Sequence, residues 1–186
     1  MKRFTLLTFL FFGMVFAGQA QKFFTKGGRI DFDATSASSP EKIQAVNRTV
    51  TCVLDAATGN LQFAVLVKGF TFERALMQEH FNENYMESEK FPKADFKGAI
   101  VNNSAVNYGK DGSYAVTVKG KLTIHGETRE VEAPGKLVIQ GSKITATASF
   151  SVLLTDYKIA IPGVVADKLN KSAKIDVSCT LEPLKS

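Results

Sequence analysis

Two histidines are the first candidates for chemistry in this chain, and neither has the neighbours that catalysis requires. His80 has Glu83 and Asn84 three and four residues further on, but a zinc site normally needs three or more converging ligands. His125 stands in a Thr-Ile-His-Gly stretch at a predicted strand end, and no nucleophile motif accompanies either histidine. We expect His125 to stabilise a turn, with a ring N–H donating to a backbone carbonyl. The pattern predicts no catalytic residue, no metal site and no cofactor.

Two acids close in sequence, Glu87 and Glu89, could be imagined as an acid/base pair. They lie in a polar stretch beside Lys90. Acid/base chemistry requires environments that push two pKa values apart, and nothing in this stretch would bury either carboxylate. We therefore expect both to be solvated.

The two cysteines, Cys52 and Cys179, fall on the apolar faces of predicted strands. Buried free thiols are common because a thiol behaves as a small apolar group. An oxidising compartment would also permit a disulfide, provided that the two Cα atoms lie within about 7 Å. Both states stay open, and the absence of a C-x-x-C motif argues against thiol chemistry.

The N-terminus has the three parts of a secretory signal peptide. Lys2 and Arg3 precede an uncharged apolar run over residues 4–16, and Gly18 and Ala20 suit cleavage after residue 20. The run is shorter than the roughly 20 residues of a membrane-spanning helix. We predict a cleaved signal over 1–20, a single domain over 21–186, no membrane span after cleavage, and a periplasmic or secreted protein. An uncleaved anchor is the weaker alternative.

The net charge does not indicate nucleic-acid binding. The formal charge of +5 falls by two once Lys2 and Arg3 are removed, and the remaining basic residues are dispersed. Binding to phosphates needs a focused positive surface, so we expect no nucleic-acid partner.

Alternation of apolar and polar residues dominates the rest of the chain. It predicts half-buried antiparallel strands. The expected strands cover residues 29–35, 42–55, 60–72, 93–101, 113–125, 129–140, 142–155 and 173–182. In the third strand the apolar parity switches after Gly69, which predicts a bulge. Eight strands in one domain suit either a closed barrel or a two-sheet sandwich.

One segment departs from this alternation. Leu76, Met77, Phe81 and Tyr85 are spaced for an amphipathic helix over about residues 73–86. Phe91-Pro92 follows the segment, and the residue before a proline disfavours helix. A helix placed after the third strand could cover one mouth of a barrel.

Three stretches resemble the YceI-like family. Residues 77–98 contain a helix followed by Phe91-Pro92 and the Phe-x-Gly of residues 96–98. Residues 118–131 contain the most specific match, Leu-Thr-Ile-His-Gly at 122–126, and residues 150–162 are similar to a late strand of the family. The resemblance extends from about Gly28 to Leu181. Residues 36–42 depart from the family pattern.

The resemblance implies an exported, lipocalin-like antiparallel barrel with a hydrophobic tunnel. Members of this family are associated with isoprenoid lipids, such as polyprenyl or quinone-type chains, and catalysis is not established for them. Combined with the strand pattern, the resemblance leads us to expect a lipid carrier that is not an enzyme.

The inward-facing apolar residues of the predicted strands and helix are the expected ligand contacts. They are Phe63, Val65, Phe70, Phe72, Leu76, Met77, Phe81, Phe96, Val116, Val118, Phe150 and Val152. The same residues would also suit a filled core. A packed structural or interaction protein of the cell envelope is therefore the alternative, and an enzyme using His80 or His125 is a weaker third. A second copy of the chain stays open as a partner.

Overall fold

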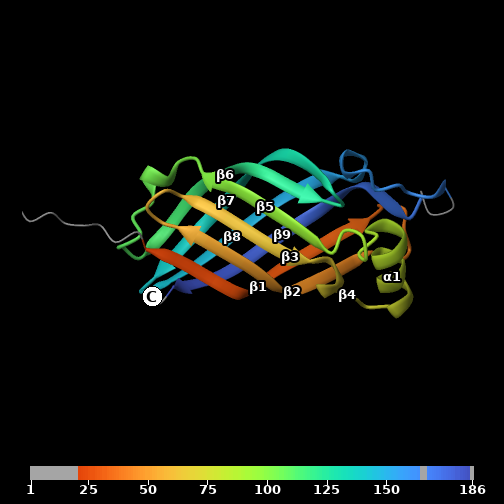
Figure 1. Ribbon diagram of the computed structural model, residues 1–186, viewed down its shortest axis with the longest axis horizontal. Coiled ribbons are helices and arrows are strands. Elements are labelled where there is room, and N and C mark those ends of the chain that lie inside the picture. Colours follow the sequence, from red (N-terminus) through yellow and green to blue (C-terminus); the bar gives the residue numbers. More distant parts are fainter. Residues whose placement is uncertain (1–20, 164–166, 185–186) are drawn as a thin grey trace, which may run out of the picture.

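A closed antiparallel barrel with eight strand positions forms the body of the molecule (Figure 1). The computed structural model describes residues 21–163 and 167–184. The predicted signal peptide lies outside these residues. The strands are β1 (Lys22–Thr35), β2 (Gln44–Asp55), β3 (Asn60–Leu66), β4 (Phe70–Phe72), β5 (Lys93–Ile100), β6 (Gly112–Ile124), β7 (Glu127–Gln140), β8 (Lys143–Leu153) and β9 (Leu169–Pro183).

Pairing between the first two strands closes the barrel. Antiparallel neighbours run from β1 through β9, β8, β7, β6, β5 and β3 to β2, and β2 pairs back with β1. β3 and β4 share one position, because both pair with β2 at different heights. The prediction of an eight-stranded antiparallel barrel is confirmed, and the sandwich alternative is wrong.

The parity switch near Gly69 comes from a break in the strand and not from the predicted bulge. A 3-10 turn over Val67–Gly69 separates β3 from β4. Asn47 is fully buried beside this break, and its side-chain amide donates to the Leu66 carbonyl at 2.9 Å. An added Cβ at Gly69 would lie 2.7 Å from the Asn47 Nδ2 atom. A glycine at this point lets the side-chain amide replace the interrupted strand pairing.

The predicted helix over 73–86 exists in a shorter, two-part form. α1 (Ala75–His80) is followed by a π-helical turn, η2 (Phe81–Tyr85). Short 3-10 turns also occur at η3 (Asn103–Ala105) and η4 (Leu154–Tyr157). α1 lies at one end of the barrel, whereas the start of β1 and the C-terminal end of the chain lie at the other (Figure 1).

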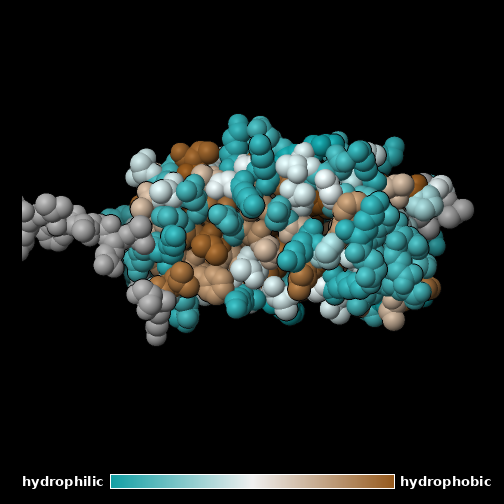
Figure 2. All heavy atoms as spheres, in the orientation of Figure 1, coloured by the Kyte–Doolittle hydropathy of each residue, from teal (hydrophilic) through white to brown (hydrophobic). Residues whose placement is uncertain are grey.

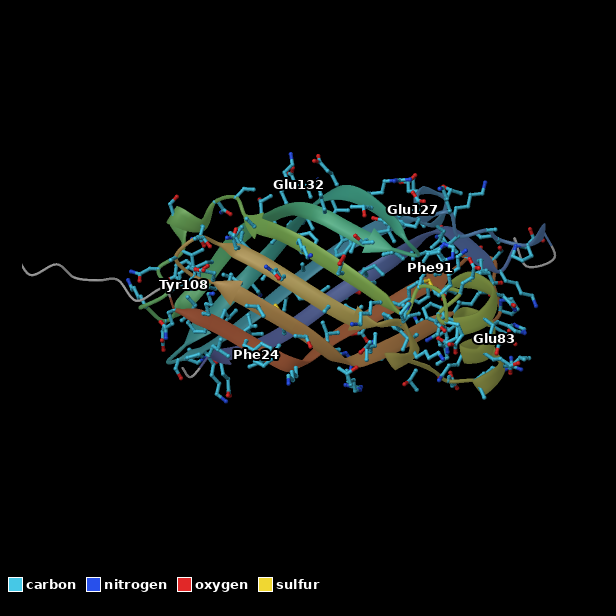
Figure 3. All side chains as sticks on the ribbon, in the orientation of Figure 1. Phe24, Glu83, Phe91, Tyr108, Glu127 and Glu132 are labelled. Atoms are coloured by element: carbon cyan, nitrogen blue, oxygen red, sulfur yellow. The ribbon has the colours of Figure 1, made fainter. Side chains whose placement is uncertain are left out.

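The end of the barrel opposite α1 is densely packed. Seven of its inward side chains are at most 1% exposed and do not border the cavity described below: Val50, Cys52, Leu54, Ile139, Ile144, Cys179 and Leu181. Tyr108 lies at this end (Figure 3), and its ring stacks on Phe23 at a centroid distance of 6.3 Å. The interior therefore has a filled half, and only the other half can hold a ligand.

Candidate ligand-binding cavity

A cavity of about 560 Å³ occupies the half of the barrel nearest α1. Its wall combines inward side chains of the strands with residues of α1 and η2. Most of the lining is aliphatic or aromatic. The polar exceptions include Glu41, Arg74, His80 and Lys168. His80 lies on α1 and Arg74 precedes it, whereas Glu41 and Lys168 lie on the segments that precede β2 and β9. Their position gives the cavity a polar mouth and an apolar interior.

Every residue predicted from the sequence as a ligand contact borders this one cavity. Val65, Phe70, Phe72, Phe81, Phe96, Val116 and Val152 are buried, while Phe63, Met77, Val118 and Phe150 are partly buried and pack against the core. Leu76 is 56% exposed and lies at the rim. The structure thus brings the twelve residues together, and their binding of a ligand stays a prediction.

Sequence reasoning missed several lining residues. Ile175 and Val177 of β9 lie on a strand whose alternation was recognised, so the same pattern could have found them. Phe32 of β1 could have been identified in the same way. Tyr157 and Ile159 also line the cavity, but they follow β8 in a turn and an irregular segment. Such a segment has no apolar period, so alternation could not have identified them as lining residues.

Four phenylalanine rings hold η2 against the barrel. Phe81, the first residue of η2, is 4.9 Å from the ring centroid of Phe72, 5.6 Å from that of Phe70 and 5.7 Å from that of Phe32. Tilted and edge-to-face contacts at these distances are favourable for aromatic pairs. The outer surface over α1 is largely hydrophilic (Figure 2). The helix therefore acts as a lid, with its apolar side on the cavity and its polar side in water.

An ion pair ties the N-terminal end of this lid to the loop between β1 and β2. Arg74, which precedes α1, pairs with Glu41 of that loop. Both side chains are well exposed, at 58% and 43%. Exposed pairs of this kind contribute little stability, so this end of the lid is only weakly held.

A histidine holds the C-terminal end of the lid. The Nε2 atom of His125 is 2.8 Å from a carboxylate oxygen of Glu87, and its Nδ1 atom is 3.0 Å from the Tyr157 carbonyl oxygen. Phe91 packs edge-on against the imidazole at a centroid distance of 4.6 Å. The expected hydrogen bond from His125 to a backbone carbonyl is confirmed. The contact with Glu87 was not expected, because the register that joins these segments is invisible in the sequence.

The backbone around His125 adopts an unusual conformation. Glu87, His125 and Lys158 have φ angles of 42°, 50° and 54°, the positive-φ values of non-glycine residues in the described part of the chain. Such angles are costly for residues with a Cβ and persist where the surroundings fix them. His125 and Gly126 form the two-residue turn between β6 and β7, where both residues have positive φ. Phe91 and Glu127 lie in this region, near α1 (Figure 3).

Lys158 completes the crossing of these loops. Its ammonium group is 2.6 Å from a Glu127 carboxylate oxygen, and this hydrogen bond lowers the pKa of Glu127. Three segments that follow η2, β6 and β8 therefore meet through His125 and its neighbours. The meeting point fixes the edge of the mouth.

The remaining candidates for chemistry are dispersed. Glu89 forms an ion pair with Lys68 and does not form an acid/base pair with Glu87. Within the described ranges, no group of three or more His, Cys, Asp or Glu side chains could hold a metal ion. Cys52 and Cys179 carry free thiols and lie in the filled half of the barrel. His80 borders the cavity at the lid.

A comparison with protein families decides where this chain belongs. The model of the YceI-like domain matches residues 8–181, nearly the whole chain. The chain belongs to the YceI-like family. The resemblance to this family that the Leu-Thr-Ile-His-Gly stretch indicated is therefore confirmed. Comparison with curated proteins gives no match.

Solved structures share this YceI-like fold at low sequence identity. A polyisoprenoid-binding domain from Saccharophagus degradans, implicated in plant cell wall breakdown, has a TM-score of 0.75 at 10% identity, covering 89% of this chain and 99% of its own. BcnA of Burkholderia cenocepacia has a TM-score of 0.65 at 15% identity, covering 83% and 95%. The Campylobacter jejuni YCEI protein has a TM-score of 0.54 at 14% identity and covers both chains fully.

No helix in the described part of this YceI-like chain combines the length and the apolar character needed to cross a membrane.

Proposed function

We propose that this protein is an exported, non-enzymatic carrier that holds one long apolar lipid in its barrel. The ligand class is an isoprenoid or quinone-type chain. The observation that carries the proposal is the cavity of about 560 Å³ with its apolar interior and polar mouth. The solved polyisoprenoid-binding domain with the same fold supports the choice of ligand class. The predicted signal peptide supports export to the periplasm or the medium.

The size of the cavity limits the enclosed tail. A water molecule takes a share of about 30 Å³ in the liquid, and a methylene group is of similar size, so the cavity accommodates roughly 20 carbon atoms. Burial stabilises each methylene by about 0.8 kcal/mol. Ten buried methylenes therefore contribute on the order of 8 kcal/mol, enough to offset the cost of ordering one ligand chain. A longer chain would have to extend beyond the mouth.

The distribution of polar groups gives the ligand a direction. Arg74, His80 and Lys168 border the cavity near α1, and the opposite end of the barrel is filled by side chains. An amphipathic lipid would therefore enter with its tail first and keep its head group in water. Met77 of the lid is partly buried against the core, and its flexible thioether can adapt to tails of different shape.

The alternative of a packed structural protein is less well supported. Such a protein would fill its interior to the density of an organic crystal, with few voids larger than a water molecule. The half of the barrel around Val50 has that character, but the half under α1 does not.

Organic extraction of natively purified protein tests the proposal. We expect mass spectrometry to find a stoichiometric lipid with an isoprenoid or similar chain. A Val118→Phe variant, which places a ring in the cavity, should carry much less of it. Leu66→Phe is the matched control, because Leu66 is 52% exposed and does not border the cavity. Lipid-free wild-type protein, or equal loading of the two variants, would contradict the proposal.

A further inference from the structure

β7 and β8 pair with each other over only part of their length. The pairing begins at the hairpin turn that joins them and ends at Gly135 with Ala148. Both strands are longer than this pairing, because β7 begins at Glu127 and pairs with β6 there, while β8 continues to Leu153 along β9. Within the described residues, no pairing joins the remaining parts of these two strands. The barrel wall therefore has a break between β7 and β8, in the half nearer α1.

The residues at the start of this break suit an interruption of the sheet. Pro134 follows the last paired residue of β7 toward α1 and has no N–H group. Within sheets, proline is found at edges and bulges, which fits a strand that becomes an edge. A Cβ at Gly135 would lie 3.0 Å from the Thr147 carbonyl oxygen and 3.4 Å from the Val116 Cγ2 atom. Because Val116 lines the cavity, a side chain at residue 135 would point inward, and its absence leaves the wall thin.

Two spaces meet at this thin part of the wall. Thr147, Ala148 and Val177 border the cavity, and the same three residues border a second hollow of about 460 Å³. Lys136 and Asp176 also line this hollow, and their exposed charged side chains place it on the outside of the barrel. We call it the outer hollow. Despite these two charges, the surface that lines it is largely apolar, so it suits an apolar chain.

The outer hollow adjoins the cavity at the end farthest from α1. Leu137 and Ala146, the next inward residues of β7 and β8, still line the cavity. The inward residues after them, Ile139 and Ile144, belong to the filled half of the barrel. A tail that enters under α1 therefore reaches the break just before the filled half stops it.

We propose that the break between β7 and β8 is a second opening of the cavity, through which the end of a long isoprenoid tail leaves the barrel. The inference deepens the proposed function and rests on it. With the opening under α1 alone, the surplus of a chain longer than about 20 carbon atoms would have to stay outside beside the head group. The second opening gives this surplus an exit at the end of the tail, while the head group stays at the polar mouth.

The missing pairing is what makes such an exit possible. Paired strands lie about 4.8 Å apart, and their backbones and hydrogen bonds fill the space between them. An isoprenoid chain could pass between paired strands only by breaking those hydrogen bonds. Beyond Gly135 and Ala148, β7 and β8 have no pairing to lose.

The turn η4 limits the opening on the side of the mouth. The carbonyl oxygen of Tyr157 lies 3.0 Å from the His125 Nδ1 atom, and the Lys158 ammonium group lies 2.6 Å from a Glu127 carboxylate oxygen. These contacts hold the segment after β8 against the start of β7. The outer hollow is accordingly lined only by residues 134–136 of β7 and 147–149 of β8, together with residues of β1 and β9.

Photo-cross-linking can locate the end of the bound tail. Lipid-free mature protein is loaded with isoprenoid alcohols of 20 and 40 carbon atoms that carry a diazirine at the tail end, and mass spectrometry identifies the labelled residues. We expect the 20-carbon probe to label residues inside the cavity, and the 40-carbon probe to label Pro134, Lys136 or Ser149 in the outer hollow. A bound 40-carbon probe that labels α1, labels only the residues reached by the shorter probe, or reacts only with water would overturn the proposal.

Two serines of β8 supply a matched pair of variants. Ser149 lines the outer hollow, whereas Ser151, two residues further along the same exposed face, borders neither space. Ser149→Trp should weaken binding of the 40-carbon alcohol at least tenfold and leave binding of the 20-carbon alcohol unchanged. Ser151→Trp should change neither. Equal affinities of the two folded variants for the 40-carbon alcohol would contradict the proposal.

Wild-type protein separates this proposal from lipid carriage itself. Binding of the 20-carbon alcohol without binding of the 40-carbon alcohol would overturn the second opening and leave lipid carriage intact. Binding of neither alcohol would refute both. Since the cross-linking uses the unchanged sequence, it decides the matter even if Ser149→Trp does not fold.

Discussion

The same substitution made in the two halves of the barrel should have opposite effects on stability. Val50 is fully buried in the filled half, whereas Val118 borders the cavity. Val50→Phe forces a ring into space that is already occupied, and overpacking of this kind costs about 1–3 kcal/mol. Val118→Phe places the same ring in open space, where cavity filling typically stabilises by about 0.5–2 kcal/mol. We expect the two lipid-free variants to differ in free energy of unfolding by at least about 1.5 kcal/mol.

Urea unfolding followed by far-ultraviolet circular dichroism measures this difference, since the chain has no Trp whose fluorescence could report it. Lipid must first be extracted, because a bound ligand would stabilise wild type and Val50→Phe more than Val118→Phe. The slope of the free energy with urea should be the same in all three proteins, as a check that only stability has changed. If Val118→Phe is destabilised as strongly as Val50→Phe, the cavity is filled in solution and the reasoning is wrong.

Three further outcomes follow from particular contacts. His125→Gly keeps the φ of 50° accessible but removes the imidazole that contacts both the Tyr157 carbonyl and Glu87. The free energy of unfolding should therefore fall by about 1–3 kcal/mol, and amide exchange should rise over residues 81–91. Unchanged exchange would contradict the role of His125 in holding the lid. Gly98→Ala should destabilise the folded protein by about 1–3 kcal/mol or more, because the added Cβ would lie 2.3 Å from the Lys119 carbonyl oxygen. Gly109→Ala is the control, because no atom would lie closer than 3.5 Å to its Cβ, and it should leave the melting temperature unchanged. Burial raises the pKa of Tyr108 to about 12 from an ordinary value of 10. The folded protein therefore binds this proton more tightly than the unfolded chain, and the free energy of unfolding should decrease from pH 10 to pH 12. A Tyr108→Phe variant that loses the same amount of stability over that range would refute the assignment.

Sequence reasoning reached the barrel because the signal for it is local. Alternation along a strand such as β8 follows from one face being buried, so residues like Val152 could be placed inward without knowing any partner strand. The same alternation predicted the parity change after residue 69. It could not distinguish a bulge from the 3-10 turn, because that choice depends on the buried amide of Asn47 from another strand.

Other features depend on contacts between distant parts of the chain. The contact of His125 with Glu87 requires the register of several strands and loops. The apolar pattern alone could not predict the cavity either, and only the family resemblance implied it. An apolar residue lining a cavity and one filling a core have the same type and the same spacing, and only the packing of all strands together separates Val118 from Val50.

Calorimetric titration of lipid-free protein with a 20-carbon isoprenoid alcohol tests the central claim most directly. The account predicts saturable binding at one site per chain, with a negative heat-capacity change from burial of apolar surface. Binding should weaken strongly in Val118→Phe and stay unchanged in Leu66→Phe. Absence of saturable binding to folded wild-type protein, or binding that Val118→Phe leaves intact, would contradict the claim that this barrel carries a lipid in its cavity.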